Sequence, residues 1–319
     1  MKKLFLLYAL VALFSAVSCT KEGVETAENQ ATATISVKLP EQVATKVYGD
    51  GKLMAKNLII GVFDENGVEK FRKNYEWDVN VFEDEIEITF FIGKTYQLVF
   101  WAQYGDAYGD PKTMKLDKIS LDYSASNNEN LDAFYYYVPK FLVNKDFQMS
   151  VELTRPFAQI NFGTTKGDID EAIAAGLHNK AVITVKNAAN TLDLFTGKTS
   201  YVDAQGNSNP KGAKIVVPAT EFPKTAEGKY HTMKVENIDY EVIAMNYVLV
   251  ADEGYVDGKT TVELNLTVGE VSIDVTNAYL KRNFKTNVVG ELLTGEGTFK
   301  VKVNPFFEDE DNHILPESK

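Results

Sequence analysis

Residue types that commonly do chemistry are few in this 319-residue sequence, and their spacing forms no known catalytic or metal-binding motif. The three histidines, His178, His231 and His313, are far apart and show no His-x-x-x-His or cysteine-rich ligand spacing. No Gly-x-Ser-x-Gly elbow or phosphate-binding glycine loop occurs. Carboxylates gather at residues 83–85 and 308–311, but acidic runs usually coat solvated turns. We therefore expect no catalytic residue, no metal site, no cofactor and no enzymatic activity.

The stretch Asp64-Glu65-Asn66-Gly67 offers oxygen atoms of the kind that bind Ca²⁺. It also separates two extended apolar stretches, and Asn-Gly is the strongest short signal for a β-hairpin. We favour the hairpin turn over the calcium site, because a turn is needed at this place.

Cys19 is the only cysteine of the chain and follows a signal-peptide pattern. Lys2 and Lys3 precede an apolar run, residues 4–14, which is followed by small residues. The run is shorter than the ~20 residues of a membrane-spanning helix. Ala16-Val17-Ser18-Cys19 is similar to a bacterial lipobox, so we expect residues 1–18 to be a signal peptide and Cys19 to be lipidated. The alternative is an incidental cysteine in a soluble periplasmic protein.

The formal net charge is −12, and removal of Lys2 and Lys3 with the signal peptide makes it more negative. An acidic chain repels phosphate backbones, so we expect no nucleic-acid partner. Two or three acyl chains hold a protein firmly on a membrane. The polar residues 19–31 are therefore predicted to be a lipidated tether to the outer membrane.

Aromatic residues form the group with two open interpretations. They could make a stacking platform for a glycan or a protein, or they could be core residues packed beneath a long loop. Successive side chains of a strand point to opposite faces, so at least one of Tyr135, Tyr136 and Tyr137 must point away from its own core. The candidate binding aromatics are Trp101, Tyr104, Tyr108, Tyr135, Tyr136 and Tyr137.

Period-two alternation of apolar and polar residues recurs along the chain, which predicts an all-β fold. One short helix is expected from Asp168, as its N-terminal cap with Glu171 three residues on, to about Gly176. Short strands separated by turn residues are typical of β-sandwiches. The predicted strands are residues 33–39, 58–64, 68–73, 85–92, 95–103, 134–143, 181–186, 214–217, 240–250, 262–268, 271–275 and 299–303.

The phase of the alternation changes at Arg155-Pro156-Phe157. Val151 and Leu153 are apolar at odd positions, whereas the apolar residues from Ala158 on stand at even positions. A change of phase moves the buried face to the other side of the strand, and proline belongs at an edge or bulge. We therefore predict two β-domains, residues 32–154 and 155–319; a bulge within one large sheet is the alternative.

A succession of segments resembles the fimbrillin-like surface lipoproteins, the type V pilus subunits of Gram-negative anaerobes. After the lipobox these segments are LPEQVATK (residues 39–46), FIGKTYQLVFWAQ (91–103), NLDAFYYYV (130–138), LTRPFAQINFGTT (153–165) and YLKRNFKTNVVGELLTG (279–295). The resemblance covers nearly the whole chain after the signal peptide. It implies two transthyretin-like β-sandwich domains and a structural or adhesive role in a pilus on the outer membrane.

The same resemblance implies maturation by a protease that cuts after a basic residue and removes a leading strand. In this sequence the strand would carry Ile35, Val37 and Leu39, and Lys46 is the candidate cleavage site. A strand of another pilus subunit, or of a second copy, would then fill the groove. No arginine precedes Arg72, so an arginine-specific protease would find no site there. A surface lipoprotein that binds a glycan or protein without polymerising therefore stays open as the alternative.

Overall fold

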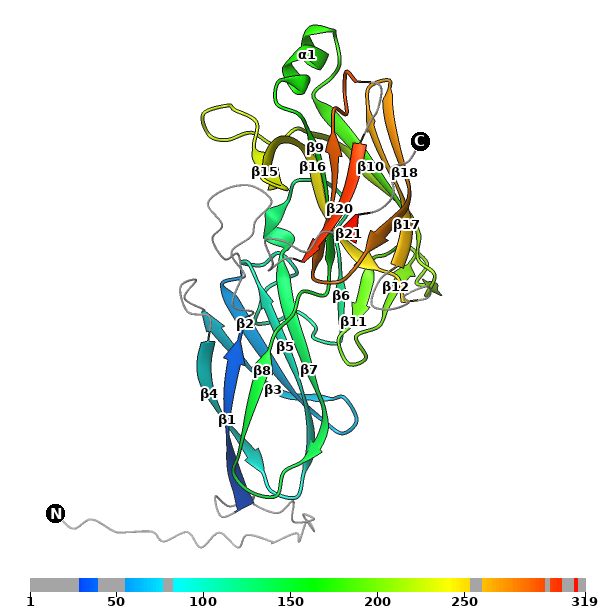
Figure 1. Ribbon diagram of the computed structural model, residues 1–319. Coiled ribbons are helices and arrows are strands. Elements are labelled where there is room, and N and C mark those ends of the chain that lie inside the picture. Colours follow the sequence, from blue (N-terminus) through cyan, green and yellow to red (C-terminus); the bar gives the residue numbers. More distant parts are fainter. Residues whose placement is uncertain are drawn as a thin grey trace, which may run out of the picture.

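The computed structural model describes residues 29–39, 55–76, 83–252, 260–295, 299–305 and 313–314. Strands dominate these residues, and they contain a single α-helix, so the all-β prediction with one short helix is confirmed. Cys19, Lys46 and the signal peptide lie outside the described residues. Figure 1 shows two groups of strands stacked end to end, with β1 in the lower group and α1 at the opposite end.

The first half of the chain forms two facing sheets. One has the order β4-β1-β8, and the other has the order β3-β2-β5-β7. Apolar side chains of both sheets, such as Ile35, Ile88 and Phe100, form the core between them. The bounds are β1 Gln30–Lys38, β2 Asn57–Asp64, β3 Glu69–Glu76, β4 Glu83–Phe91, β5 Thr95–Gln103, β7 Ala133–Leu142 and β8 Phe147–Glu152.

The second half is built on a ten-stranded sheet with the order β18-β17-β10-β16-β9-β19-β20-β21, with β14 beside β10 and β15 beside β16. β10 meets β16 only through Ala188 and Ala189, so the strands fold over into two layers around one apolar core. The bounds are β9 Ala158–Thr164, β10 Lys180–Ala189, β14 Ala213–Glu221, β15 Thr232–Val235, β16 Ile238–Val250, β17 Thr260–Val268, β18 Val271–Leu280, β19 Phe284–Gly290, β20 Phe299–Pro305 and β21 His313–Ile314.

A small sheet joins the two halves. β6 (Lys118–Ser120), which follows β5 in the chain, pairs with β11 (Thr191–Asp193) of the second half. β12 (Thr199–Val202) and β13 (Ser208–Asn209) complete this sheet. A shared apolar cluster continues the junction, because Val99 and Trp101 of β5 belong to the same cluster as Leu192, Met245 and Tyr247. The two central strands of the sheet, β2 and β5, are thereby buried on both faces.

The change of phase at Pro156 coincides with a change of sheet. β8 ends at Glu152, β9 begins at Ala158, and Pro156 lies in neither strand. β9 differs from a simple alternating strand, because Gln159 and Asn161 are buried along with the apolar positions. The reason is that β9 is a central strand, flanked by β16 and β19. The division into residues 32–154 and 155–319 remains a proposal, and the shared cluster couples the two halves.

Helix α1 (Asp168–Ala174) differs from the prediction at its start. Gly167, not Asp168, is the N-terminal cap, and it has a left-handed backbone with φ of 89°. The Asp168 carboxylate instead accepts hydrogen bonds from the backbone N–H groups of Leu293 and Thr294, at 2.9 and 3.0 Å. It therefore fastens the helix to the segment after β19, a partner that local sequence cannot reveal. The predicted end at Gly176 is confirmed by its φ of 97°.

Turn chemistry follows the sequence closely. Gly67 has φ of 79° in the β2–β3 hairpin, and Gly269 has φ of 57° in the β17–β18 hairpin. The Asp64 carboxylate accepts hydrogen bonds from the N–H groups of Asn66 and Val68, which is the geometry of a turn. Strand β19 was not predicted, because FKTNVVG lacks a clear alternation.

Gly212, just before β14, is expected to be intolerant of a side chain. Its φ is +76°, and an added Cβ would lie 2.6 Å from the carbonyl carbon of Asn187 and 2.7 Å from the carbonyl oxygen of Ala188. We expect Gly212→Ala to lower the free energy of unfolding by more than about 2 kcal/mol, since left-handed strain adds to a backbone clash. Gly206→Ala is the control in urea denaturation. Gly206 has φ of +85° with nothing within 4 Å, so equal losses for the two variants would contradict the clash.

Candidate functional site

β1 occupies the middle of its sheet, although it is the first strand of the described chain. It pairs antiparallel with β4, from Gln30↔Phe91 to Lys38↔Glu83. It pairs in parallel with β8, from Ala33↔Phe147 to Lys38↔Glu152. β4 and β8 therefore meet only through β1, as Figure 1 also shows.

The side chains of β1 alternate between core and surface. Ala33, Ile35 and Val37 are completely buried, and Leu39 just after the strand is almost so. Thr32, Thr34, Ser36 and Lys38 are half-buried on the other face. The strand thus carries a row of apolar side chains in register with pockets between the two sheets, as predicted for Ile35, Val37 and Leu39.

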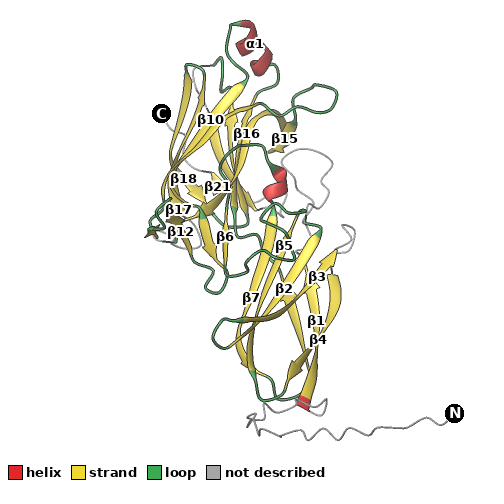
Figure 2. Ribbon diagram, turned by 180° about the vertical axis from the view of Figure 1, so that it is seen from behind, coloured by secondary structure: helices red, strands yellow, loops and turns green. Residues whose placement is uncertain are grey.

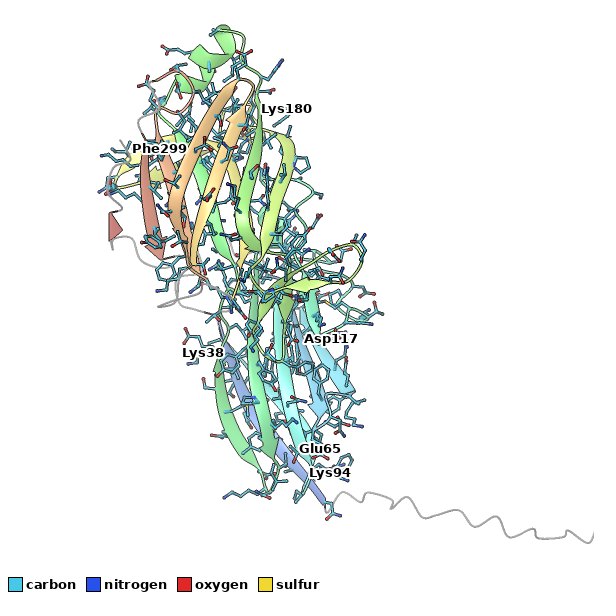
Figure 3. All side chains as sticks on the ribbon, turned by 90° about the vertical axis from the view of Figure 1, so that its right-hand side faces the viewer. Lys38, Glu65, Lys94, Asp117, Lys180 and Phe299 are labelled. Carbon is cyan, nitrogen blue, oxygen red and sulfur yellow. The ribbon has the colours of Figure 1, made fainter. Side chains whose placement is uncertain are left out.

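Hydrogen bonds beyond the ladder hold both ends of β1. At its start the Ile92 N–H donates to the Asn29 carbonyl oxygen at 2.7 Å, and the Thr32 N–H donates to the Asp146 carboxylate at 2.8 Å. At its end the Leu153 N–H donates to the Lys38 carbonyl oxygen at 2.9 Å. Lys38 lies near the junction of the two halves in Figure 3.

Removal of β1 would have a clear physical consequence. Two strands that flank a missing strand lie about 9.6 Å apart, twice the usual spacing, and each presents unpaired N–H and C=O groups. The row of buried apolar pockets between the sheets would open at the same time. Such a groove is a template for an extended segment with alternating apolar side chains. The geometry of the sheet is therefore suited to an extended segment in the place of β1.

The stacking hypothesis is wrong for Trp101, because its side chain has no exposed surface. Trp101 is completely buried, and its indole N–H donates to the Gln103 side chain at 2.9 Å. Its ring meets Tyr108 edge-on at 5.1 Å, and Tyr108 stacks on Phe157 at 6.0 Å. Trp101 is covered by the segment after β5 and by the second half, so it has no face left for a ligand.

The tyrosines of β7 divide between the two faces of their strand, as expected. Tyr136 is exposed, whereas Tyr135 and Tyr137 are half-buried against the shared cluster. The Tyr137 hydroxyl donates to the Gln97 side chain at 2.7 Å. Tyr104 is half-buried with the Lys56 ammonium 5.1 Å from its ring centre. Tyr135 and Tyr137 therefore pack against the shared cluster, whereas a binding role for Tyr104 and Tyr136 stays a prediction.

A buried ion pair joins Arg155, at the change of phase, to Asp132, and it was not predicted from the sequence. The Arg155 guanidinium donates two hydrogen bonds to the Asp132 carboxylate, at 2.7 and 2.8 Å. The side chains are only 1% and 6% exposed. Arg155 also lies over the Phe134 ring, 4.4 Å from its centre. The one sequence signal was an arginine between two predicted buried stretches, which demands a partner that only the fold supplies.

Lys285 on β19 lies near the Arg155–Asp132 pair, and the charges of both residues affect its pKa. Burial and the nearby positive charge of Arg155 lower the pKa of Lys285 to about 7, opposed by the carboxylates of Asp132 and Glu129. The unfolded chain has the ordinary value of 10.5. Unfolding therefore takes up a proton between about pH 7 and pH 10.5, so the free energy of unfolding should rise with pH across that window.

Urea denaturation at pH 7, 8 and 9 tests this expectation. The slope of stability against pH should be smaller in Lys285→Met, which has no proton to gain. Lys180→Met, which changes a lysine with an exposed ammonium, is the control and should keep the full slope. Equal slopes in the native chain and in Lys285→Met would show that Lys285 titrates as an ordinary lysine.

The other chemistry-bearing residues stay scattered. No group of three His, Cys, Asp or Glu side chains in the described ranges could hold a metal ion. His178 lies beside a surface hollow after α1, and burial lowers the pKa of His231. Within the part of the chain that the structure describes, no helix is long and apolar enough to cross a membrane.

The fold and the central placement of β1 define an all-β protein of two stacked sandwiches whose first strand completes a sheet. The chain belongs to the DUF6562 family, a family of unknown function whose profile matches residues 25–316. No protein with a curated description matches the chain.

Several solved structures are similar over most of their length. A DUF1812 protein of Bacteroides thetaiotaomicron is 14% identical, with a TM-score of 0.49, and the match covers 90% of this chain and 98% of that one. A fimbrial assembly protein of Parabacteroides distasonis is 12% identical, with a TM-score of 0.44 and coverages of 90% and 100%. The fimbrial anchor protein Mfa2 of Porphyromonas gingivalis is 13% identical, with a TM-score of 0.45 and coverages of 86% and 98%.

Proposed function

We propose that this chain is a fimbrillin-like outer-membrane lipoprotein, a non-enzymatic structural or adhesive component of a pilus that assembles by exchange of β1. The observation that carries the proposal is the position of β1. It is the first strand of the fold, it lies between β4 and β8, and it buries a complete row of apolar side chains.

Strand exchange needs a strand that can leave without breaking the chain elsewhere. β1 meets this condition among the described residues, because it precedes every other described strand and the chain leads from it to β2 through residues 40–54. Lys46 is in that connection, so a cut after Lys46 would free β1 from the chain that begins at Val47. A second copy or another pilus subunit would then supply the replacement strand, with main-chain hydrogen bonds for affinity and alternate side chains for register.

Intact mass and N-terminal sequencing of the protein released from outer membranes test the proposal. A chain that begins at Val47 and runs as an SDS-resistant ladder is the expected result for a polymerising subunit. Lys46→Ala should abolish both, whereas Lys52→Ala in the same connection should leave both unchanged. A chain that begins at an acylated Cys19 and stays monomeric would contradict exchange of β1, and would favour a permanently anchored protein that binds a surface glycan or protein.

A peptide experiment tests the groove directly. The chain that begins at Val47 should bind a synthetic peptide of residues 29–39, because that peptide restores β1. A peptide with Ile35→Lys should fail to bind, since the charged side chain would enter a pocket that is closed to water. Equal binding of the two peptides would contradict a β1 groove.

A further inference from the structure

One end of the first half carries exposed apolar side chains on three neighbouring turns. We call it the β1-entry end and define it as residues 65–68, 92–94 and 142–146. Val68 is 54% exposed, Ile92 39% and Leu142 55%. They are three of the seven large hydrophobic side chains that are exposed in the described chain. Such side chains, gathered at one end of a molecule, mark an interaction surface.

Backbone hydrogen bonds join two of these turns, 92–94 and 142–146. The Gly93 N–H donates to the Val143 carbonyl oxygen at 2.7 Å, and the Val143 N–H donates to the Lys94 carbonyl oxygen at 3.0 Å. A cavity of about 590 Å³ lies between the turn at 65–68 and the turn at 92–94, with Lys70 and Lys94 among its lining residues. Figure 3 shows Glu65 and Lys94 together at this end of the molecule.

The charge of the β1-entry end differs from the charge of the whole chain. Around the turns stand four lysines, Lys70, Lys94, Lys140 and Lys145, and four carboxylates, Asp64, Glu65, Glu69 and Asp146. Lys70 pairs with Asp64 at 2.9 Å, and Asp146 accepts the Thr32 N–H. This end is thus close to neutral in a chain with a formal net charge of −12. An anionic surface repels it less than it repels the remainder of the protein.

The chain that carries the candidate anchor enters the fold at this end. The Asn29 carbonyl oxygen accepts the Ile92 N–H at 2.7 Å, so Asn29 lies beside the exposed Ile92. Cys19 stands ten residues earlier, and a fully extended chain of that length spans at most about 35 Å. A lipid on Cys19 would therefore keep the β1-entry end within about 35 Å of the bilayer.

We propose that the β1-entry end is a membrane-contact surface, which lies on the phospholipid headgroups beside the lipid anchor. Val68, Ile92 and Leu142 enter the headgroup layer, and the flanking lysines meet lipid phosphates. This inference rests on the proposed anchoring through Cys19 and concerns the chain before cleavage after Lys46, because that cut would separate Cys19 and β1 from the rest of the fold. The molecule would then stand upright, with α1 at the end that points away from the membrane (Figures 1 and 2).

The test anchors the chain chemically, so that it does not depend on lipidation in the cell. Cys19 is the only cysteine, so residues 19–319 can be coupled through it to a maleimide lipid in vesicles of phosphatidylethanolamine and phosphatidylglycerol. Amide hydrogen exchange is then compared between the coupled and the free chain. We expect exchange at residues 65–68, 92–94 and 142–146 to slow several-fold on vesicles, and exchange at residues 175–179 beyond α1 to stay unchanged.

Matched variants sharpen the test. Ile92→Glu with Leu142→Glu should abolish the protection, because carboxylates are repelled by the anionic vesicle. Val216→Glu with Ile238→Glu changes two side chains of similar exposure in the second half, 49% and 53%, and should retain the protection. Equal exchange in the coupled and free native chain would overturn the membrane contact. Whether Cys19 is acylated in cells is read separately from the intact mass, so failure of the anchor and failure of the contact are distinguishable.

Discussion

Replacing Ile35 by lysine is expected to lower the free energy of unfolding by more than about 4 kcal/mol. Ile35 is completely buried in β1, opposite Ile86 of β4 on one side and Met149 of β8 on the other. Lysine there would place an ammonium group among the apolar side chains of the core between the two sheets. The charged group must then lose its proton, distort the sheet or expel β1.

Thr34→Lys is the matched control, because it adds the same side chain one residue earlier in the same strand. Thr34 is half-buried on the outer face, and its cross-strand neighbour on β4 is Glu87. An ammonium opposite a carboxylate is neutral to slightly stabilising in a sheet, by up to about 1 kcal/mol. Urea denaturation of both variants measures the difference. Losses of similar size would mean that β1 is loosely held and that its inner face is open to water.

Breaking the buried ion pair between Asp132 and Arg155 is expected to have the second large effect on the free energy of unfolding. Asp132→Ala would leave the Arg155 guanidinium buried without its carboxylate, at a cost of about 3–5 kcal/mol. The loss arises mainly from the charge left in a dry site, not from the attraction of the pair itself. Replacing both partners together, as Arg155→Met with Asp132→Leu, should therefore recover most of the stability.

Glu221→Ala is the control for this prediction. It removes an exposed ion pair with Lys180, whose charged atoms are 3.7 Å apart, and should change stability by no more than about 1 kcal/mol. Thermal and urea unfolding of Asp132→Ala, of the double variant and of Glu221→Ala would measure these differences in stability. A loss below about 1 kcal/mol for Asp132→Ala would show that water reaches Arg155 in solution.

Alternation of apolar and polar residues was sufficient to predict most strands. The pattern of β4, with Ile86, Ile88 and Phe90 buried and Glu85 and Glu87 exposed, is the one that the sequence predicts. Period two is a local property of an extended backbone, so it survives in the sequence whatever the strand pairs with. The turn at Asn66-Gly67 is local for the same reason, since glycine reaches a positive φ without strain.

The sequence by itself determined where most of the strands lie, which face of each is apolar and where turns separate them. Only the tertiary structure decided the partners: that β1 lies between β4 and the distant β8, and that Asp132 meets Arg155. It also decided that Trp101 is core, because a loop and the second half cover a sheet face that alternation leaves unassigned. The physical reason is that side-chain direction follows from the local backbone, whereas strand pairing and burial depend on contacts between residues far apart in the chain.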